Sequence, residues 1–180
     1  MIIDCLHAGH YFFGREWLIL DPGLKTPPEM FGVNVIAGDD RIWLPQLAGG
    51  YFIIGVGYPL RKRKELFDAA VAAGVKPHIA IKHPSAVISA HAQVGEGTVV
   101  LANAVINISA RVGRNVIINT GAIVEHDSVV GDHSHIAPGA VLCGGVTIGE
   151  GVMVGANATI LPCVQVPDWT TIKAGSLEAV

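Results

Sequence analysis

One short run of this chain combines a histidine with two acidic neighbours. Glu125, His126 and Asp127 form the only place in the sequence where two carboxylates flank a histidine. An adjacent carboxylate stabilises the imidazolium and fixes the ring tautomer, which is what a general base requires. His133 and His135 follow shortly afterwards. The alternative interpretation is that the run is a solvent-exposed turn that does no chemistry.

These residues lie inside a strict repeat of six residues. Every sixth residue from Ile88 to Ile172 is Val, Ile or Leu without an exception, and a small or β-branched residue stands two positions before each of them, from Ala86 to Thr170. A period of six with one obligatory aliphatic residue is typical of a parallel β-helix. Three hexads make one triangular coil, so the repeat predicts about five coils whose interior columns join residues eighteen apart. No insertion interrupts the repeat, so any site must be built from corner residues and outer faces.

The first part of the chain follows a different pattern. Short apolar strands are expected at 17–20, 33–36, 51–57 and 75–81. A helix between the last two strands is expected to end at Gly74, and the basic run at 61–64 is interpreted as its solvated start. Strands that alternate with a helix predict a small parallel α/β unit. We therefore divide the chain into a small α/β domain, residues 1–82, and a β-helix domain, residues 83–180.

Composition excludes several classes of protein. A net charge of −3 over 180 residues, without a clustered basic face, argues against a nucleic-acid partner. Hydrophobic residues make up 51% of the chain, yet no uninterrupted apolar run of about 18 residues predicts a membrane span. Cys5, Cys143 and Cys163 lack metal-ligand spacing, and no signal peptide is recognised before them. A reducing, cytoplasmic location is expected.

The repeat and its motifs resemble a known family, the bacterial hexapeptide-repeat sugar acyltransferases. This family includes the N-acetyltransferases of nucleotide-linked amino sugars and the sialic-acid-type O-acetyltransferases. The matching motifs are His83-Pro84-Ser85-Ala86, Asn119-Thr120-Gly121-Ala122, Glu125-His126-Asp127, Val130-Gly131-Asp132, His135-Ile136-Ala137-Pro138-Gly139-Ala140 and Leu161-Pro162. The resemblance covers residues 75–176 strongly and 17–74 weakly. It implies a mainly β fold, a left-handed parallel β-helix that forms a homotrimer with acetyl-CoA between neighbouring prisms.

The resemblance implies roles for four polar residues. His126 is expected to be the general base and Asp127 its carboxylate partner. His135 would line the acetyl end of the cofactor site, and Asn119 would reach the sugar. A histidine with a pKa near 6.5 suits this role, because the attacking amine or hydroxyl must lose a proton.

The resemblance also implies contacts for the co-substrate and the nucleotide. The backbone N–H of Gly144 would stabilise the oxyanion, and the pantetheine arm would run past Gly144, Gly155 and Ala156. Asp21 is the candidate contact to the base of the nucleotide. Relatives begin with a strand and a glycine-rich turn that this chain is expected to lack, and they continue past its C-terminus with a short tail over the adenine.

The expected function is therefore acetyl-CoA-dependent N-acetylation of an amino group on a nucleotide-linked sugar. Transfer would be direct, without an acyl-enzyme and without a metal ion. Sugar O-acetylation of the sialic-acid type uses the same base and thioester and stays open. Two further alternatives are a zinc carbonic-anhydrase-like protein, because His126, His133 and His135 lie close in sequence, and an inactive scaffold.

Overall fold

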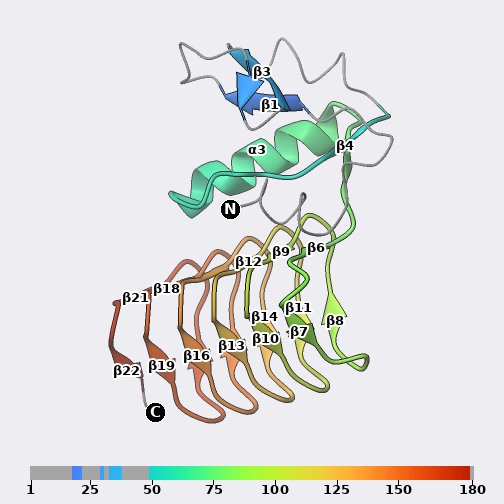
Figure 1. Cartoon of the computed structure of the whole chain (residues 1–180). Coiled ribbons are helices and arrows are strands. Elements are labelled where there is room, and N and C mark those ends of the chain that lie inside the picture. Colours follow the sequence, from blue (N-terminus) through green and yellow to red (C-terminus); the bar gives the residue numbers. More distant parts are fainter. Residues whose placement is uncertain (1–17, 22–28, 31–32, 38–48, 179–180) are drawn as a thin grey trace.

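The computed structural model describes residues 18–21, 29–30, 33–37 and 49–178. Most of this part of the chain is a parallel β-helix, and one α-helix lies along the side of the stacked coils (Figure 1). Within the described residues, no helix is long and apolar enough to cross a membrane. The fold is thus mainly β, as the repeat predicts.

Two-residue strands form the three parallel sheets of the β-helix, and each sheet is named here after its first strand. The β6 sheet consists of β6 (Ile81–Lys82), β9 (Val99–Val100), β12 (Ile117–Ile118), β15 (His135–Ile136), β18 (Met153–Val154) and β21 (Thr171–Ile172). The β7 sheet consists of β7 (Val87–Ile88), β10 (Val105–Ile106), β13 (Ile123–Val124), β16 (Val141–Leu142), β19 (Thr159–Ile160) and β22 (Leu177–Glu178). The β8 sheet consists of β8 (Gln93–Val94), β11 (Arg111–Val112), β14 (Val129–Val130), β17 (Thr147–Ile148) and β20 (Gln165–Val166).

Three corners join these sheets, and each corner is named after the two sheets that it connects. The chain passes from the β6 sheet through the β6/β7 corner, the β7/β8 corner and the β8/β6 corner, and then begins the next coil. Positions eighteen residues apart therefore stack along the same corner. This stacking decides which side chains can meet.

The interior register agrees with the predicted columns. Ile106 pairs with Val124, which pairs with Leu142, in adjacent coils of the β7 sheet. Val124 and Leu142 are fully buried. Strands extend one hexad beyond the aliphatic repeat at both ends, where Lys82 and Glu178 occupy the hexad position. Polar residues are tolerated there because the end coils have a neighbour on one side only.

The N-terminal part contains two small sheets and the helix. β1 (Leu18–Asp21) is parallel to β3 (Val33–Ala37), and β2 (Glu29–Met30) is antiparallel to β3. β4 (Tyr51–Phe52) and β5 (Lys76–Pro77) form a parallel pair around α3 (Leu60–Ala72). This β4–α3–β5 unit confirms the predicted parallel α/β connection.

Helix α3 ends as the sequence predicts. Gly74 adopts a φ of +79°, in the left-handed region that glycine enters without strain. The backbone N–H of Gly74 donates to the carbonyl of Val71, which closes the last turn. The chain then turns into β5.

The predicted buried strand at 51–57 is wrong in length and in burial. β4 covers only Tyr51 and Phe52, and Tyr51 is 52% exposed. The following residues form no ladder with another strand. Their carbonyl groups instead bind side chains of Arg63 and His135, as described below.

The interpretation of the basic run as solvated is also wrong at one residue. Arg63 is completely buried, together with Leu60, Phe67 and Ala70 on the same face of α3. Spacings of three and four residues place these side chains on one side of a helix. The phenyl ring of Phe67 packs edge-on against His133 at a centroid distance of 5.4 Å, so this face docks against the β8/β6 corner.

The outer surface of the β6 sheet is covered in its first coils. Ile81, Val99 and Ile117 point outward from their strands, yet they are 0%, 1% and 6% exposed. A Cβ atom on Gly57 would lie 4.0 Å from Ile117, which places this N-terminal segment against the sheet. The first β-helix strand begins at Ile81, within this covered region.

The interior column provides a test of the fold. Leu142→Ala should lower the free energy of unfolding by about 2 to 5 kcal/mol, because the coil cannot collapse into the cavity. The outward-facing Thr147→Ala should change it by less than about 0.5 kcal/mol. Urea unfolding followed by circular dichroism measures both values. Equal effects of the two substitutions would contradict the assigned interior face.

Candidate active site

His126 lies on the β7/β8 corner that follows β13, with 57% of its side chain exposed. Its Nδ1 atom lies 2.9 Å from Oδ2 of Asp127. A carboxylate only accepts hydrogen bonds, so Nδ1 carries the proton and Nε2 keeps a lone pair. No described residue contacts that Nε2 atom through a hydrogen bond. The ring is therefore oriented so that its basic nitrogen is free to take a proton.

Glu125 has a different role from Asp127 at this corner. Its Oε2 atom accepts hydrogen bonds from the backbone N–H of His126 and from Nδ2 of Asn107, at 3.1 and 2.9 Å. Asn107 occupies the same corner position one coil earlier. Glu125 therefore anchors the backbone of the corner, whereas Asp127 orients the imidazole.

The surrounding carboxylates change the protonation of His126. The hydrogen bond to Asp127 raises the pKa of His126 above its usual value, and the negative charges of Asp127 and Glu125 act in the same direction. Because the raised pKa favours the imidazolium, the free base becomes the major form only at a higher pH than for an isolated histidine.

Gly144 stacks on the same corner, one coil after His126. A Cβ atom at this position would lie 2.6 Å from both Cε1 and Nε2 of the His126 ring. Only glycine therefore lets the ring lie over this corner. The backbone N–H of Gly144 has no acceptor among the described residues, whereas the equivalent N–H of His126 is bonded by the Glu125 side chain. Gly144, whose N–H is free among the described residues, thus lies against the His126 ring.

Asn119 and His135 form a second cluster at the β6/β7 corner. Nδ2 of Asn119 lies 2.9 Å from Nε2 of His135, and Nδ1 of His135 lies 3.0 Å from the carbonyl oxygen of Gly57. Both side chains are buried, at 4% and 8% exposure. Burial lowers the pKa of His135, and the charge of Arg63 lowers it further against the opposing effect of the Gly57 carbonyl. His135 is therefore neutral near pH 7.

The two candidate cofactor residues of the later coil share this second corner. Gly155 stacks two coils after Asn119, and Ala156 follows it. A Cβ atom on Gly155 would lie 2.7 Å from Cα of Ala174, so close packing of the next coil already requires this glycine.

The predicted site residues therefore divide between two corners of one chain. His126, Asp127 and Gly144 lie at the β7/β8 corner. The other group, at or beside the β6/β7 corner, is Asn119, His135, Gly155 and Ala156. One chain does not bring the two groups together. Asp21 is the last residue of β1, where its backbone pairs with Ala37; the position of its side chain lies outside the described part of the chain.

His133 has a structural environment that its sequence neighbours did not reveal. It is 3% exposed, and Nδ2 of Asn115 donates to its Nδ1 atom at 2.9 Å. It lies at the β8/β6 corner under Phe67, away from the corner of His126. Within the described residues of one chain, no group of three or more His, Cys, Asp or Glu side chains is arranged to hold a metal ion.

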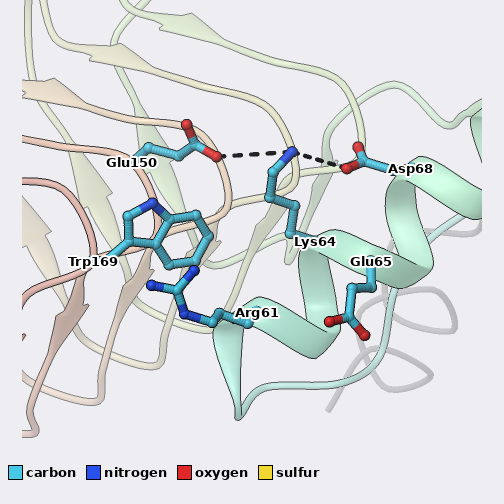
Figure 2. A pocket seen from close by; sticks show the side chains of 6 residues that line it. All are labelled: Arg61, Lys64, Glu65, Asp68, Glu150 and Trp169. Atoms are coloured by element: carbon cyan, nitrogen blue, oxygen red, sulfur yellow. Dashed lines mark hydrogen bonds and ion pairs between the residues drawn. The ribbon is translucent and has the colours of Figure 1, made fainter.

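A charged pocket lies between α3 and the β8/β6 corner (Figure 2). No residue of the two clusters lines it. It is lined by Arg61, Lys64, Glu65, Asp68, Glu150 and Trp169. Lys64 lies 2.8 Å from Asp68 and 3.9 Å from Glu150, and the Arg61 guanidinium lies 4.5 Å from the centre of the Trp169 ring. The Lys64–Glu150 ion pair and the Arg61–Trp169 cation–π contact join α3 to two successive coils of the β-helix, so the pocket belongs to this contact.

Sequence reasoning missed the contribution of the N-terminal segment to the second cluster. The ligand that orients His135 is the backbone carbonyl of Gly57, 78 residues away in sequence. A backbone carbonyl carries no residue-type signal. The only indication was the glycine-containing run Gly55-Val56-Gly57, which forms part of the weak resemblance in this region.

Comparisons with known proteins agree with the hexapeptide repeat and with the fold. The sequence pattern of bacterial transferase hexapeptide repeats (six repeats) matches residues 109–144. The acetyltransferase domain of PglB from Neisseria gonorrhoeae is 30% identical, with a TM-score of 0.86 over 99% of this chain and 85% of that one. The same domain solved with acetyl coenzyme A is 31% identical, with a TM-score of 0.85 over 97% and 82% of the two chains.

A second solved protein is equally similar. PerB from Caulobacter crescentus, in complex with CoA and GDP-perosamine, is 30% identical with a TM-score of 0.82, over 92% of this chain and 89% of that one. No curated protein sequence matches the chain. The repeat, the fold and the level of identity lead to one assignment: this chain belongs to the bacterial hexapeptide-repeat sugar acyltransferase family.

Proposed function

We propose that this enzyme transfers the acetyl group of acetyl-CoA to the amino group of a nucleotide-linked amino sugar. The observation that carries the proposal is the free Nε2 of His126, with Nδ1 held by Asp127 and an unbonded N–H of Gly144 beside the ring. The similar structures that hold acetyl coenzyme A, or CoA with GDP-perosamine, support the class of both substrates.

The reaction follows from these three groups. The amine nitrogen attacks the thioester carbonyl carbon, a C–N bond forms, and the Gly144 N–H stabilises the resulting oxyanion. Nε2 of His126 takes the proton that the nitrogen loses, and Asp127 stabilises the imidazolium. The intermediate then collapses, the C–S bond breaks, and the imidazolium returns its proton to the leaving CoA thiolate. No acyl-enzyme is required.

The complete site is proposed to lie between two chains of a homotrimer. The β6/β7 and β7/β8 corners border the same β7 sheet. Its outer face is apolar at every strand except β19, with Val87, Val105, Ile123, Val141 and Leu177 beside Thr159. Val87 and Leu177 are 62% and 65% exposed in one chain. The outer face of the β8 sheet is instead mostly polar, with Gln93, Arg111, Thr147 and Gln165 beside a single valine, Val129. Packing of β7 sheets around a threefold axis would cover the apolar face and bring unlike corners together.

The roles at the site are then divided between two neighbouring chains. One chain would supply His126 to the attacking amine and Gly144 to the thioester carbonyl. The next chain would supply Asn119 to the sugar, His135 to the acetyl end, and Gly155 and Ala156 to the pantetheine arm. The Asn119 amide still has a second Nδ2 hydrogen for a sugar hydroxyl. Asp21 remains the proposed contact to the nucleotide base.

Removal of the proposed base gives the first test. His126→Ala should lower kcat by about 10² to 10⁴, the usual contribution of general base catalysis, when acetyl-CoA is assayed with a panel of nucleotide-linked amino sugars. His91→Ala, which removes another exposed histidine, should leave kcat unchanged. Mass spectrometry of the product should locate the acetyl group on nitrogen; acetylation on oxygen would select the O-acetyltransferase alternative. Turnover within twofold of wild type in His126→Ala would remove this residue from the mechanism.

The pH dependence tests the pairing of His126 with Asp127. The wild-type kcat/KM should fall on the acidic side with an apparent pKa above the usual 6.5, because the paired carboxylate favours the inactive imidazolium. Asp127→Asn should move this acidic limb to lower pH, since the favourable charge is lost. The peak rate should also decrease, because the imidazolium formed during attack loses its stabilisation. An acidic limb at the same pH in both proteins would show that Asp127 does not act on the base.

Mixing two inactive variants tests the shared site. Chains with His126→Ala and chains with Asn119→Ala should each be impaired as homotrimers. A mixed trimer contains one interface with both residues intact, so random 1:1 assembly by co-expression should restore about a quarter of the wild-type activity. Simple mixing without subunit exchange is the control. If both residues serve a site within one chain, co-expression restores nothing.

A further inference from the structure

Arg63 is a buried cation without an acidic partner among the described residues. Its Nε atom donates to the carbonyl of Asn115 at 2.9 Å, and its Nη1 atom donates to the carbonyls of Ile54 and Val56 at 2.6 and 2.9 Å. Nη2 has no partner in the described part of the chain. Burial lowers the pKa of Arg63 to about 9, so the side chain is still charged at neutral pH.

The type of residue at this position needs an explanation. An apolar side chain of similar volume would fill the space without removing a charge from water, and such replacements are often neutral or stabilising. An apolar side chain cannot, however, donate three directed hydrogen bonds to backbone carbonyls. The planar guanidinium can reach carbonyls on two sides at once, which a lysine ammonium does less well. The donors therefore point to a role in holding the segment at residues 54–57.

That segment presents its carbonyls to two different partners. The carbonyls of Ile54 and Val56 bind the same nitrogen of Arg63, whereas the carbonyl of Gly57 binds His135. The carbonyls of residues 54 and 56 therefore face Arg63, and the next carbonyl faces the β6 sheet. Because the three carbonyls belong to four consecutive residues, holding the first two restricts the direction of the third.

The Gly57 carbonyl determines the tautomer of His135. A carbonyl only accepts, so Nδ1 of His135 must carry the proton, and Nε2 is left to accept from Nδ2 of Asn119. The orientation of the Asn119 amide is fixed independently, because its Oδ1 atom accepts from the backbone N–H of Thr120 at 2.8 Å. The opposite tautomer would place two donors face to face.

We propose that Arg63 is a positioning residue for His135 and Asn119. By binding two carbonyls on one side of the segment, it holds the carbonyl of Gly57 where His135 must adopt the Nδ1–H tautomer. Nε2 of His135 then keeps the Asn119 amide in place at the β6/β7 corner. The consequence for catalysis rests on the proposed function, whereas the tautomer does not.

Imidazole ¹⁵N chemical shifts of the full chain, labelled at histidine, test the tautomer directly. The wild type should show Nδ1 protonated and Nε2 unprotonated for His135, assigned by loss of its signals in His135→Gln. Arg63→Met should convert this to a mixture of both tautomers. Arg61→Met, an exposed arginine on the same helix, should leave the signals unchanged. Asn119→Ala should also keep the Nδ1–H form, because the bond to Gly57 remains.

Kinetics of the same variants test the consequence. Arg63→Met should lower kcat by about 10- to 100-fold, the loss typical of a small misplacement, with KM for acetyl-CoA changed by less than about threefold. Arg63→Lys should recover part of kcat and part of the Nδ1–H form. Circular dichroism and oligomeric state must match the wild type; if Arg63→Met does not fold, Arg63→Lys is compared directly with the wild type.

Two results separate this proposal from the proposed function. An unchanged His135 tautomer in whichever Arg63 variant folds would overturn the positioning role, whatever the activity. If the wild-type chain acetylates none of the sugars tested, the proposed function fails, but the tautomer shift in Arg63→Met still decides the role of Arg63.

Discussion

The backbone ladder between residues eighteen apart is the constraint on which the rest of this structure depends. Each coil donates its N–H groups to the carbonyls of the next, so every corner position recurs at the spacing of adjacent strands. A side chain at a corner is therefore packed between the residues one coil before and one coil after. His126 lies between Ile108 and Gly144 for this reason, and only the missing Cβ of Gly144 leaves room for its ring. The geometry of the candidate base is thus a consequence of the register.

The N-terminal unit adds a second constraint, which is polar. Phe67 packs against the β-helix at His133, but the buried Arg63 joins the two parts through hydrogen bonds to backbone carbonyls. Removing a charge from water is costly, and three donated hydrogen bonds offset part of that cost. An apolar contact would allow the segment at 54–57 to slide, whereas directed donors hold it in one position. The orientation of His135 depends on that position.

The division of the site between two corners connects the fold to its chemistry. The corners of a triangular prism lie apart, so each corner of one chain carries either the base or the second cluster. In the proposed trimer, the edges of two prisms placed together would surround a substrate with both. The apolar outer face of the β7 sheet, which lies between these corners, is the surface that such packing would cover. In this arrangement, assembly and catalysis depend on the same sheet.

Residues whose roles are local or periodic were determined by the sequence itself. The hexads identified the strands, the interior columns and the corners, because each unit of six residues forms one strand and one corner in the same environment. The sequence also predicted that α3 ends at Gly74. It predicted that Asp127 pairs with His126, because the two residues are adjacent. Tertiary structure alone decided that Arg63 is buried, that residues 53–57 form no strand, and that His133 is enclosed under Phe67. It also decided that Gly57 orients His135. Each of these depends on contacts between residues far apart in sequence, and neither a basic run nor a backbone carbonyl carries a local signal of what will pack against it.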